Sequence, residues 1–167
     1  MSSVSKVVWI RAALVLAAAI GLVHPFYYWT LYGGDGIIHL VYAANLLAGH
    51  PLQFNPGLPD SGETSVGFML LLAGIMKAVG EAGVPYAVKG LSLLSLYLIA
   101  FQTWRIGAAL GLGREWRAAA AIATLLLPGS VLNGMAGTEN SLFAALVLVW
   151  LDCALRCGWF SQARASG

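Results

Sequence analysis

The sequence of 167 residues has little charge and little cysteine. Charged residues make up 10% of it, against about 25% in a typical soluble domain, and hydrophobic residues make up 59%. With glycine counted and tyrosine left out, the apolar share is about 67%, against about 45–50% in soluble domains. This composition excludes a soluble globular domain, and it excludes a disordered chain because disorder needs low hydrophobicity. Two cysteines are too few for a disulfide scaffold.

Short catalytic and metal-binding motifs are also missing. The sequence contains no glycine-rich phosphate loop, no Gly-x-Ser-x-Gly and no His-Glu-x-x-His. Cys153 and Cys157 lie four residues apart, but two ligands do not make a zinc site, so we expect reduced thiols. The net charge of +2 does not indicate a nucleic-acid partner, and none is expected.

Long apolar runs are what the sequence does have, and its mean hydropathy is +0.80. Because one membrane span takes about 20 apolar residues, the chain has room for at most about five or six. The four clearest candidates cover residues 7–31, 86–110, 116–136 and 141–157. A fifth run, 66–79, is shorter and is interrupted by Gly67, Gly74 and Lys77, which suits a helix embedded in one face of the membrane. The predicted fold class is an all-α polytopic membrane protein, with 1–167 as a single membrane domain.

The first run begins near Trp9 and ends in a group of aromatic residues at 26–32. Aromatic residues at both ends of an apolar run are typical of the two interfaces of a membrane. A cleaved signal peptide is the alternative. The apolar and aromatic stretch continues well past any alanine-rich cleavage site, which favours an uncleaved anchor.

The distribution of the nine basic residues decides how many runs cross, because basic residues favour the cytoplasmic side. If 66–79 crosses fully, three arginines between 105 and 117 lie outside. If it does not cross, only Lys77 and Lys89 remain outside, and the cytoplasmic set is Lys6, Arg11, Arg105, Arg114, Arg117, Arg156 and Arg164. We therefore expect four spans, a plasma-membrane (inner-membrane) location and two cytoplasmic termini.

The same topology places most carboxylates on the outer face, in a first outer loop, 33–84, and a second outer loop, 135–140. The outer carboxylates are those of Asp35, Asp60, Glu63, Glu81 and Glu139. Glu115 is expected on the cytoplasmic side, and Asp152 near the cytoplasmic end of the last span.

The first outer loop is predicted to begin with an amphipathic interfacial helix. Asp35 is placed to cap a helix that covers 37–48 and ends at Gly49. His39, Tyr42 and Asn45 recur at helical spacing, so we expect them to face the aqueous side while the apolar residues face lipid or the bundle. For Asp35, capping alone is the alternative to a functional role.

Two further polar groups adjoin predicted helices. A loop rich in Pro and Gly, 50–63, leads into Glu63-Thr64-Ser65, which either caps the embedded helix or lines a polar cavity at membrane depth. Glu139 and Asn140 precede the last span, where the helix dipole favours a carboxylate, so capping is again the alternative. An ionisable group beside the bilayer is otherwise a functional candidate.

Taken in order, these motifs resemble the N-terminal part of a GT-C membrane glycosyltransferase, in particular the bacterial arabinofuranosyltransferase-like branch. Protein mannosyltransferases are similar in plan, with an acidic motif in the first outer loop and a second acid after the third span. The matching segments are 35–49, which opens with Asp35-Gly-Ile-Ile-His39, then Phe54-Asn-Pro-Gly57, Glu63-Thr-Ser65 and Gly137-Thr-Glu139-Asn-Ser-Leu-Phe143.

The resemblance implies transfer of a sugar from a polyprenyl-phosphate donor to an acceptor hydroxyl of a cell-envelope glycan, lipid or protein. It implies Asp35 as the catalytic base for the acceptor proton, and His39 as a candidate donor to the leaving phosphate. Asp35 and Glu139 are the candidate ligands for a divalent cation, Mg²⁺ or Mn²⁺. The residues assigned to substrate binding are His39, Tyr42, Asn45, Glu63, Thr64, Glu139 and Asn140. Membrane lipids are the remaining expected partners.

The sequence departs from the family pattern at three positions. Gly34 replaces the first Asp of an Asp pair, Val41 stands where the family often has Arg, and Val66 replaces a Pro. Family members run to several hundred residues with more spans, so we expect a truncated or partial form. The competing hypothesis is a non-catalytic membrane protein, such as a scaffold, accessory subunit or small carrier, in which the outer acids are scattered caps. The site hypothesis instead brings Asp35, Glu63 and Glu139 together.

Overall fold

The computed structural model describes residues 3–58 and 62–159, so Asp60 and Arg164 lie outside the described residues. Within these ranges the chain is helical, and its only strand-like feature is an isolated bridge between Asn55 and Leu58. The α-helices are α1 (Ser3–Val23), α2 (Gly34–Leu47), α3 (Val66–Val79), α4 (Val84–Ala109), α5 (Arg114–Leu126), α6 (Pro128–Gly134) and α7 (Asn140–Arg156). Two short 3-10 helices, η1 (His24–Tyr28) and η2 (Glu81–Gly83), precede α2 and α4. The predicted all-α class is confirmed.

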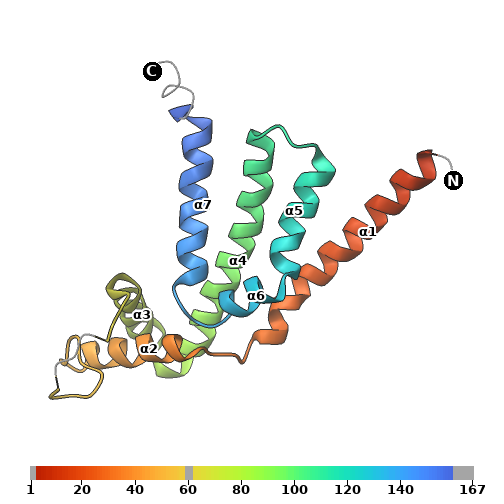
Figure 1. Ribbon diagram of the computed structural model, residues 1–167. Helices are drawn as coiled ribbons and strands as arrows, with labels where there is room; N and C mark the ends of the chain where they lie inside the picture. The colour runs from red at the N-terminus through yellow and green to blue at the C-terminus, as the bar shows by residue number, and fades with distance from the viewer. Residues whose placement is uncertain (1–2, 59–61, 160–167) are drawn as a thin grey trace.

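The helices α1, α4, α5 and α7 run between two ends of the molecule (Figure 1). α4 packs against both α5 and α7, and α1 packs against α5. At one end α2 and α3 pack on each other and α3 contacts α4, while α6 lies across the same end. The start of α1, the turn between α4 and α5, and the end of α7 lie at the opposite end (Figure 1).

Charged residues divide between these two ends, and the division gives each end its name. The acidic end carries Asp35, Glu63, Glu81 and Glu139 together with Lys77 and Lys89. The basic end carries Arg11, Arg105, Arg114, Arg117 and Arg156 together with Glu115 and Asp152. Lys77 is exposed, whereas Lys89 is 1% exposed inside the protein.

Two stretches are long and apolar enough to cross a membrane, judged by length and composition. They are Val7–Tyr28, which combines α1 with η1, and Glu81–Ala109, which combines η2 with α4. α7 covers nearly the residues expected for the last span.

The prediction of one continuous helix over 116–136 is wrong. α5 ends at Leu126, the backbone of Leu127 is extended, and Pro128 opens the separate helix α6. Proline disfavours the helical conformation in the residue before it, which explains the break. With 13 residues, α5 is roughly 20 Å long, shorter than the hydrocarbon core of a bilayer.

The start of α2 differs from the prediction and its end agrees with it. The helix begins at Gly34 and Gly33 occupies the N-cap position without a side-chain cap, so the prediction that Asp35 is the cap is wrong. Asp35 lies in the first turn, where the helix dipole favours a carboxylate. Gly49 ends the helix with φ +87, its N–H bonded to Leu46 O, as predicted from its lack of a side chain.

The polar stripe of α2 faces the protein interior, so the prediction that it faces water is wrong. His39 is 2% exposed and Tyr42 is 1% exposed, whereas Ile37 is 51% and Leu47 49% exposed. Tyr42 belongs to a core cluster with α3 and the start of α4, formed by Ala43, Phe68, Met69, Leu72, Ala73, Val84 and Val88. The stripe is buried because its polar atoms find partners inside the protein, which removes the cost of leaving water.

The predicted embedded helix is confirmed as a helix with the expected bounds. α3 covers Val66–Val79 and ends at Gly80, whose φ of +70 stops the helix. Phe68, Met69 and Leu72 are buried against the core, while Leu70 is 54% exposed.

Candidate functional site

His39 of α2 lies between two glutamates that come from distant parts of the chain. Its Nδ1 is 2.8 Å from Glu63 Oε1, and its Nε2 is 3.0 Å from Glu139 Oε2. The ring edge also packs on the face of Phe68, with the centroids 5.5 Å apart. Glu63 precedes α3 and Glu139 precedes α7, so His39 joins three helices at the acidic end.

Glu63 is held almost entirely out of water. Its side chain is 1% exposed, and its Oε1 also accepts the Ser65 N–H at 2.7 Å. That bond fixes the turn before α3. Ser65 is the N-cap residue of α3, its hydroxyl makes no capping bond, and Thr64 is exposed. Of the three residues, only Glu63 bonds to the start of the helix, through the Ser65 N–H.

One oxygen of Glu63 is left without a partner. Glu63 Oε2 is buried and has no hydrogen bond within the described part of the chain, and the same holds for the hydroxyl of Thr138, next to Glu139. Buried polar atoms are almost always hydrogen-bonded, so these two oxygens are exceptional. The two orphaned oxygens lie on segments that converge at His39.

Glu139 is the more accessible of the two glutamates. It occupies the N-cap position of α7 but makes no side-chain capping bond, so the capping alternative is wrong for its side chain as well. Its carboxylate turns to His39 and is 31% exposed. Glu139 is thus the member of the cluster that a solute can reach.

The hydrogen bonds of His39 fix how many protons the cluster needs. Both ring nitrogens face carboxylate oxygens, which accept when ionised. Both bonds are satisfied if the imidazole is doubly protonated, or if it is neutral and one glutamate is protonated. In either arrangement the three groups share two protons and carry one net negative charge.

Asp35 lies one helical turn before His39 on α2. Residues four apart on a helix are neighbours on its surface. Asp35 is exposed, and it makes no hydrogen bond or ion pair with any residue that the structure describes. The structure therefore brings Glu63 and Glu139 together through His39, and Asp35 is not part of this cluster.

The remaining residues assigned to substrate binding do not face one common cavity. Tyr42 is buried with its ring 5.8 Å from that of Phe54. Asn45 Nδ2 donates to the carbonyls of Gln53 and Phe54, each at 2.8 Å. These contacts hold the loop after α2 against the helix. Asn140 is exposed at the start of α7.

Lys89 is a central residue of this end that sequence reasoning missed. It is buried in α4, donates to the backbone carbonyls of Leu31 and Met135, and lies 4.1 Å from the centroid of the Tyr32 ring. Its three partners use the three donors of an ammonium group. Lys89 thereby holds the segment before Asp35 and the segment before Glu139 against α4. The one indication in the sequence that Lys89 has a structural role is that a lysine is unusual within an apolar run.

The start of α2 and the second outer loop also approach closely through their backbones. Gly33 N–H donates to Ala136 O at 2.8 Å. A Cβ at Gly36 would lie 2.7 Å from the same oxygen, and Gly137, with φ +78, packs under the ring of Tyr32. Burial raises the pKa of the Tyr32 phenol, whose hydroxyl donates to Pro85 O at 2.9 Å. Glycine is required here because a side chain would force these two segments apart.

The divalent cation predicted at Asp35 and Glu139 stays a prediction. Across the described ranges, no group of three or more His, Cys, Asp or Glu side chains is arranged to hold a metal ion. The nitrogens of His39 are both engaged by glutamates, and Asp35 is not part of the cluster's bonds.

No family model, curated protein or solved structure matches this chain. The likeness to GT-C glycosyltransferases therefore rests on the residues themselves and stays a prediction.

Proposed function

We propose that this chain is a multi-span membrane protein whose acidic end faces outward and takes part in glycosyl transfer from a polyprenyl-phosphate sugar. The two long apolar helices and the separation of basic from acidic residues support the membrane location. In this arrangement α1, α4, α7 and the α5–α6 pair cross the bilayer, and the break at Pro128 lies where α6 packs against η1 and α4.

Convergence is the observation that carries the site assignment. Capping residues have no reason to meet, yet Glu63 and Glu139 reach the same imidazole although 24 and 100 positions separate them from it. Burying such groups is costly unless they are paired. Asp35 is exposed and unengaged one helical turn before His39, which supports a site where a carboxylate accepts a proton.

In the proposed reaction Asp35 takes the proton of the acceptor hydroxyl as the new glycosidic bond forms. The bond between the sugar carbon and the carrier phosphate breaks, and the phosphate leaves with the electron pair. The His39 cluster ties α2, which carries Asp35, to the segments that precede α3 and α7. Glu139, the accessible member, is placed to accept hydrogen bonds from sugar hydroxyls.

The test replaces Asp35 with Asn, which keeps the shape of the side chain and removes the base. Removing a general base costs roughly a hundred- to ten-thousand-fold in rate. In membranes from the source cell, Asp35→Asn should lower transfer from polyprenyl-phosphate arabinose or mannose by that factor. Glu81→Gln, an exposed carboxylate at the same end, is the matched control and should keep the wild-type rate.

Two results would contradict the proposal. Full transfer activity in Asp35→Asn removes Asp35 as the base. Transfer that does not depend on this chain at all favours the non-catalytic scaffold, in which the His39 cluster serves only to tie three helices together.

A further inference from the structure

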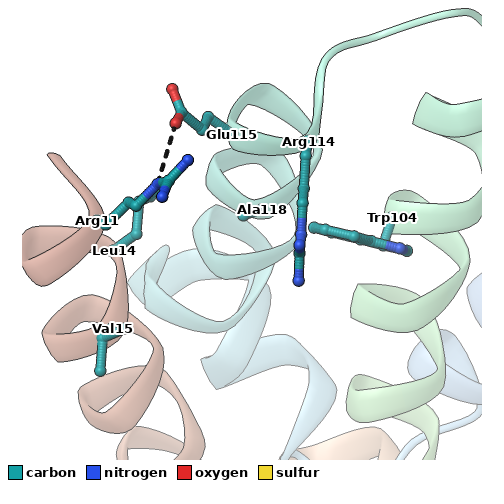
Figure 2. Close-up of a pocket in the computed structure, with 7 residues that line it drawn as sticks. All are labelled: Arg11, Leu14, Val15, Trp104, Arg114, Glu115 and Ala118. Atoms are coloured by element: carbon teal, nitrogen blue, oxygen red, sulfur yellow. Dashed lines mark ion pairs between the residues drawn. The ribbon is translucent and has the colours of Figure 1, made fainter. Parts of the chain in front are cut away.

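A pocket of about 440 Å³ opens at the basic end between α1 and α5 (Figure 2). Arg11 of α1 and Arg114 and Glu115 of α5 supply its charged lining, Trp104 of α4 forms one wall, and the rest of the lining is aliphatic. This pocket lies at the opposite end of the bundle from the His39 cluster and shares no residue with it.

The two arginines of the pocket are available to a ligand. Arg11 Nε is 3.7 Å from Glu115 Oε1, and the two side chains are 72% and 47% exposed. An exposed pair at this distance contributes about 0–1 kcal/mol, so an anion can replace it. Arg114 is exposed and makes no ion pair or hydrogen bond with any described residue. Figure 2 shows its side chain extended into the space beside Trp104.

Trp104 is held rigidly between the charged pocket and an apolar groove. The Arg117 guanidinium lies 4.2 Å from its ring centroid, and Arg117 Nε donates to Trp104 O at 3.2 Å. A second cavity, of about 220 Å³, begins at the same tryptophan and continues between α1, α4 and α5. Its lining is wholly apolar and includes Ala18, Leu22 and Leu125.

The pocket and the groove follow one another along the same helices. On α1 the lining residues run from Arg11 to Leu22, a rise of roughly 16 Å. That length is about half of the roughly 30 Å hydrocarbon core, or one leaflet. A cationic pocket that leads into an apolar groove of one leaflet's depth has the shape of a phospholipid.

We propose that this pocket and groove bind one anionic phospholipid, with its phosphate between Arg11 and Arg114 and one acyl chain in the groove beside Trp104. The basic end as a whole has five arginines against two carboxylates among the described residues, which favours a headgroup with net negative charge. Lipid binding here rests on the membrane location in the proposed function, but it does not depend on glycosyl transfer.

The experiment measures lipid retained by the full chain after extraction, using native mass spectrometry with phosphatidylglycerol and phosphatidylcholine at equal concentration. We expect preferential retention of phosphatidylglycerol. Arg114→Gln should lower its apparent affinity about fivefold, the effect of about 1 kcal/mol for one basic residue at an anionic lipid surface. Lys77→Gln removes the same charge from an exposed site at the acidic end and should leave retention unchanged.

A second pair of variants tests the groove without changing charge. Ala18→Phe fills the groove between α1 and α5 and should lower retention of phosphatidylglycerol. Ala12→Phe adds the same ring at an exposed position of α1, outside both cavities, and should have no effect. Glycerol phosphate, which has the headgroup charge but no acyl chain, should not displace the lipid at equal concentration.

Circular dichroism and size-exclusion elution establish that each variant is folded before its lipid content is compared. Equal retention of the two lipids, or an equal loss in Lys77→Gln and Arg114→Gln, would overturn the lipid site. Displacement by glycerol phosphate would instead identify a pocket for a soluble phosphate compound, which also overturns it. Recovery of the chain outside the membrane fraction marks failure of the membrane location, whereas Asp35→Asn should retain lipid like the wild type whatever its activity.

Discussion

The two ends of the bundle use charged residues in different ways. At the acidic end His39 and Glu63 are almost fully buried and are joined to each other and to Glu139 across long sequence distances. At the basic end Arg11, Arg105 and Arg156 stay 72%, 38% and 46% exposed. Burying a charged group is expensive unless it is fully paired. Among the described residues, the buried cluster that joins three distant segments lies at the acidic end, which supports a functional site there.

Asp152 is the exception that sharpens the comparison. It is 1% exposed at the basic end, with Arg105 Nη2 2.7 Å from Oδ2 and Arg156 Nε 2.8 Å from Oδ1. Its partners reach solvent, and Arg156 lies one turn away on the same helix. Asp152 therefore ties α4 to α7, whereas the His39 cluster joins α2 to the segments that precede α3 and α7.

The largest expected effect comes from removing the centre of the acidic-end cluster. His39→Leu leaves the buried Glu63 carboxylate without its partner, and breaking such a pair costs about 3–5 kcal/mol in the free energy of unfolding. His24→Leu is the matched control, because Nδ1 of His24 makes one bond to Leu125 O at 3.0 Å, and it should cost about 1 kcal/mol. Equilibrium unfolding in mixed micelles measures both. Equal losses in free energy of unfolding would mean that the His39 cluster contributes no more to stability than a single hydrogen bond does.

A second prediction compares alanine substitutions at two glycines of α2, Gly34 and Gly36. Gly36→Ala places a Cβ 2.7 Å from Ala136 O and 2.9 Å from Gly137 O, both backbone atoms, and should lower the free energy of unfolding by about 1–3 kcal/mol. Gly34 has nothing within 4 Å of the added Cβ. Gly34→Ala should be neutral or slightly stabilising, because alanine favours a helix more than glycine does. Equilibrium unfolding in mixed micelles measures both variants. An unchanged free energy of unfolding in Gly36→Ala would show that α2 and the second outer loop are not in contact at Gly36.

The smallest effects belong to the basic end. Asp152→Asn weakens two ion pairs, but the exposed arginines are rehydrated, so the loss in free energy of unfolding should be about 1 kcal/mol. Glu115→Gln removes the 3.7 Å pair with Arg11 and should change stability by less than about 0.5 kcal/mol. Raising the salt concentration should reduce the difference in free energy of unfolding between Asp152→Asn and Glu115→Gln, because salt screens exposed ion pairs. A loss in Asp152→Asn as large as that in His39→Leu would remove the contrast between the ends.

Much of the fold could be predicted because local signals mark it. The apolar run before Gly80 gave the bounds of α3, and Gly49 gave the end of α2. The break at Pro128 was not predicted, because apolar content alone extends the helix across it. The proline is visible in the sequence, and it disfavours the helical conformation at Leu127. Weighing the proline against the apolar count would have found it.

The site could be predicted only in part, because its geometry depends on tertiary contacts. The sequence predicted that Asp35, Glu63 and Glu139 come together. Glu63 and Glu139 do meet through His39, whereas Asp35 is not bonded to them. Helical spacing predicted that His39 lies on a polar stripe of the helix. It did not predict that the stripe faces the protein interior. Lys89 was placed outside by charge distribution alone, because no local pattern shows that two backbone carbonyls would turn toward it.

The most direct measurement of the central claim is a double-mutant cycle between His39 and Glu139, made with His39→Leu and Glu139→Gln. Residues in contact couple by about 0.5–3 kcal/mol, and distant residues add within about 0.3–0.5 kcal/mol. The 3.0 Å bond predicts a coupling of at least about 1 kcal/mol, with none between His39 and the exposed Glu81. Additive losses for His39 and Glu139 would contradict the convergence on which the candidate site depends.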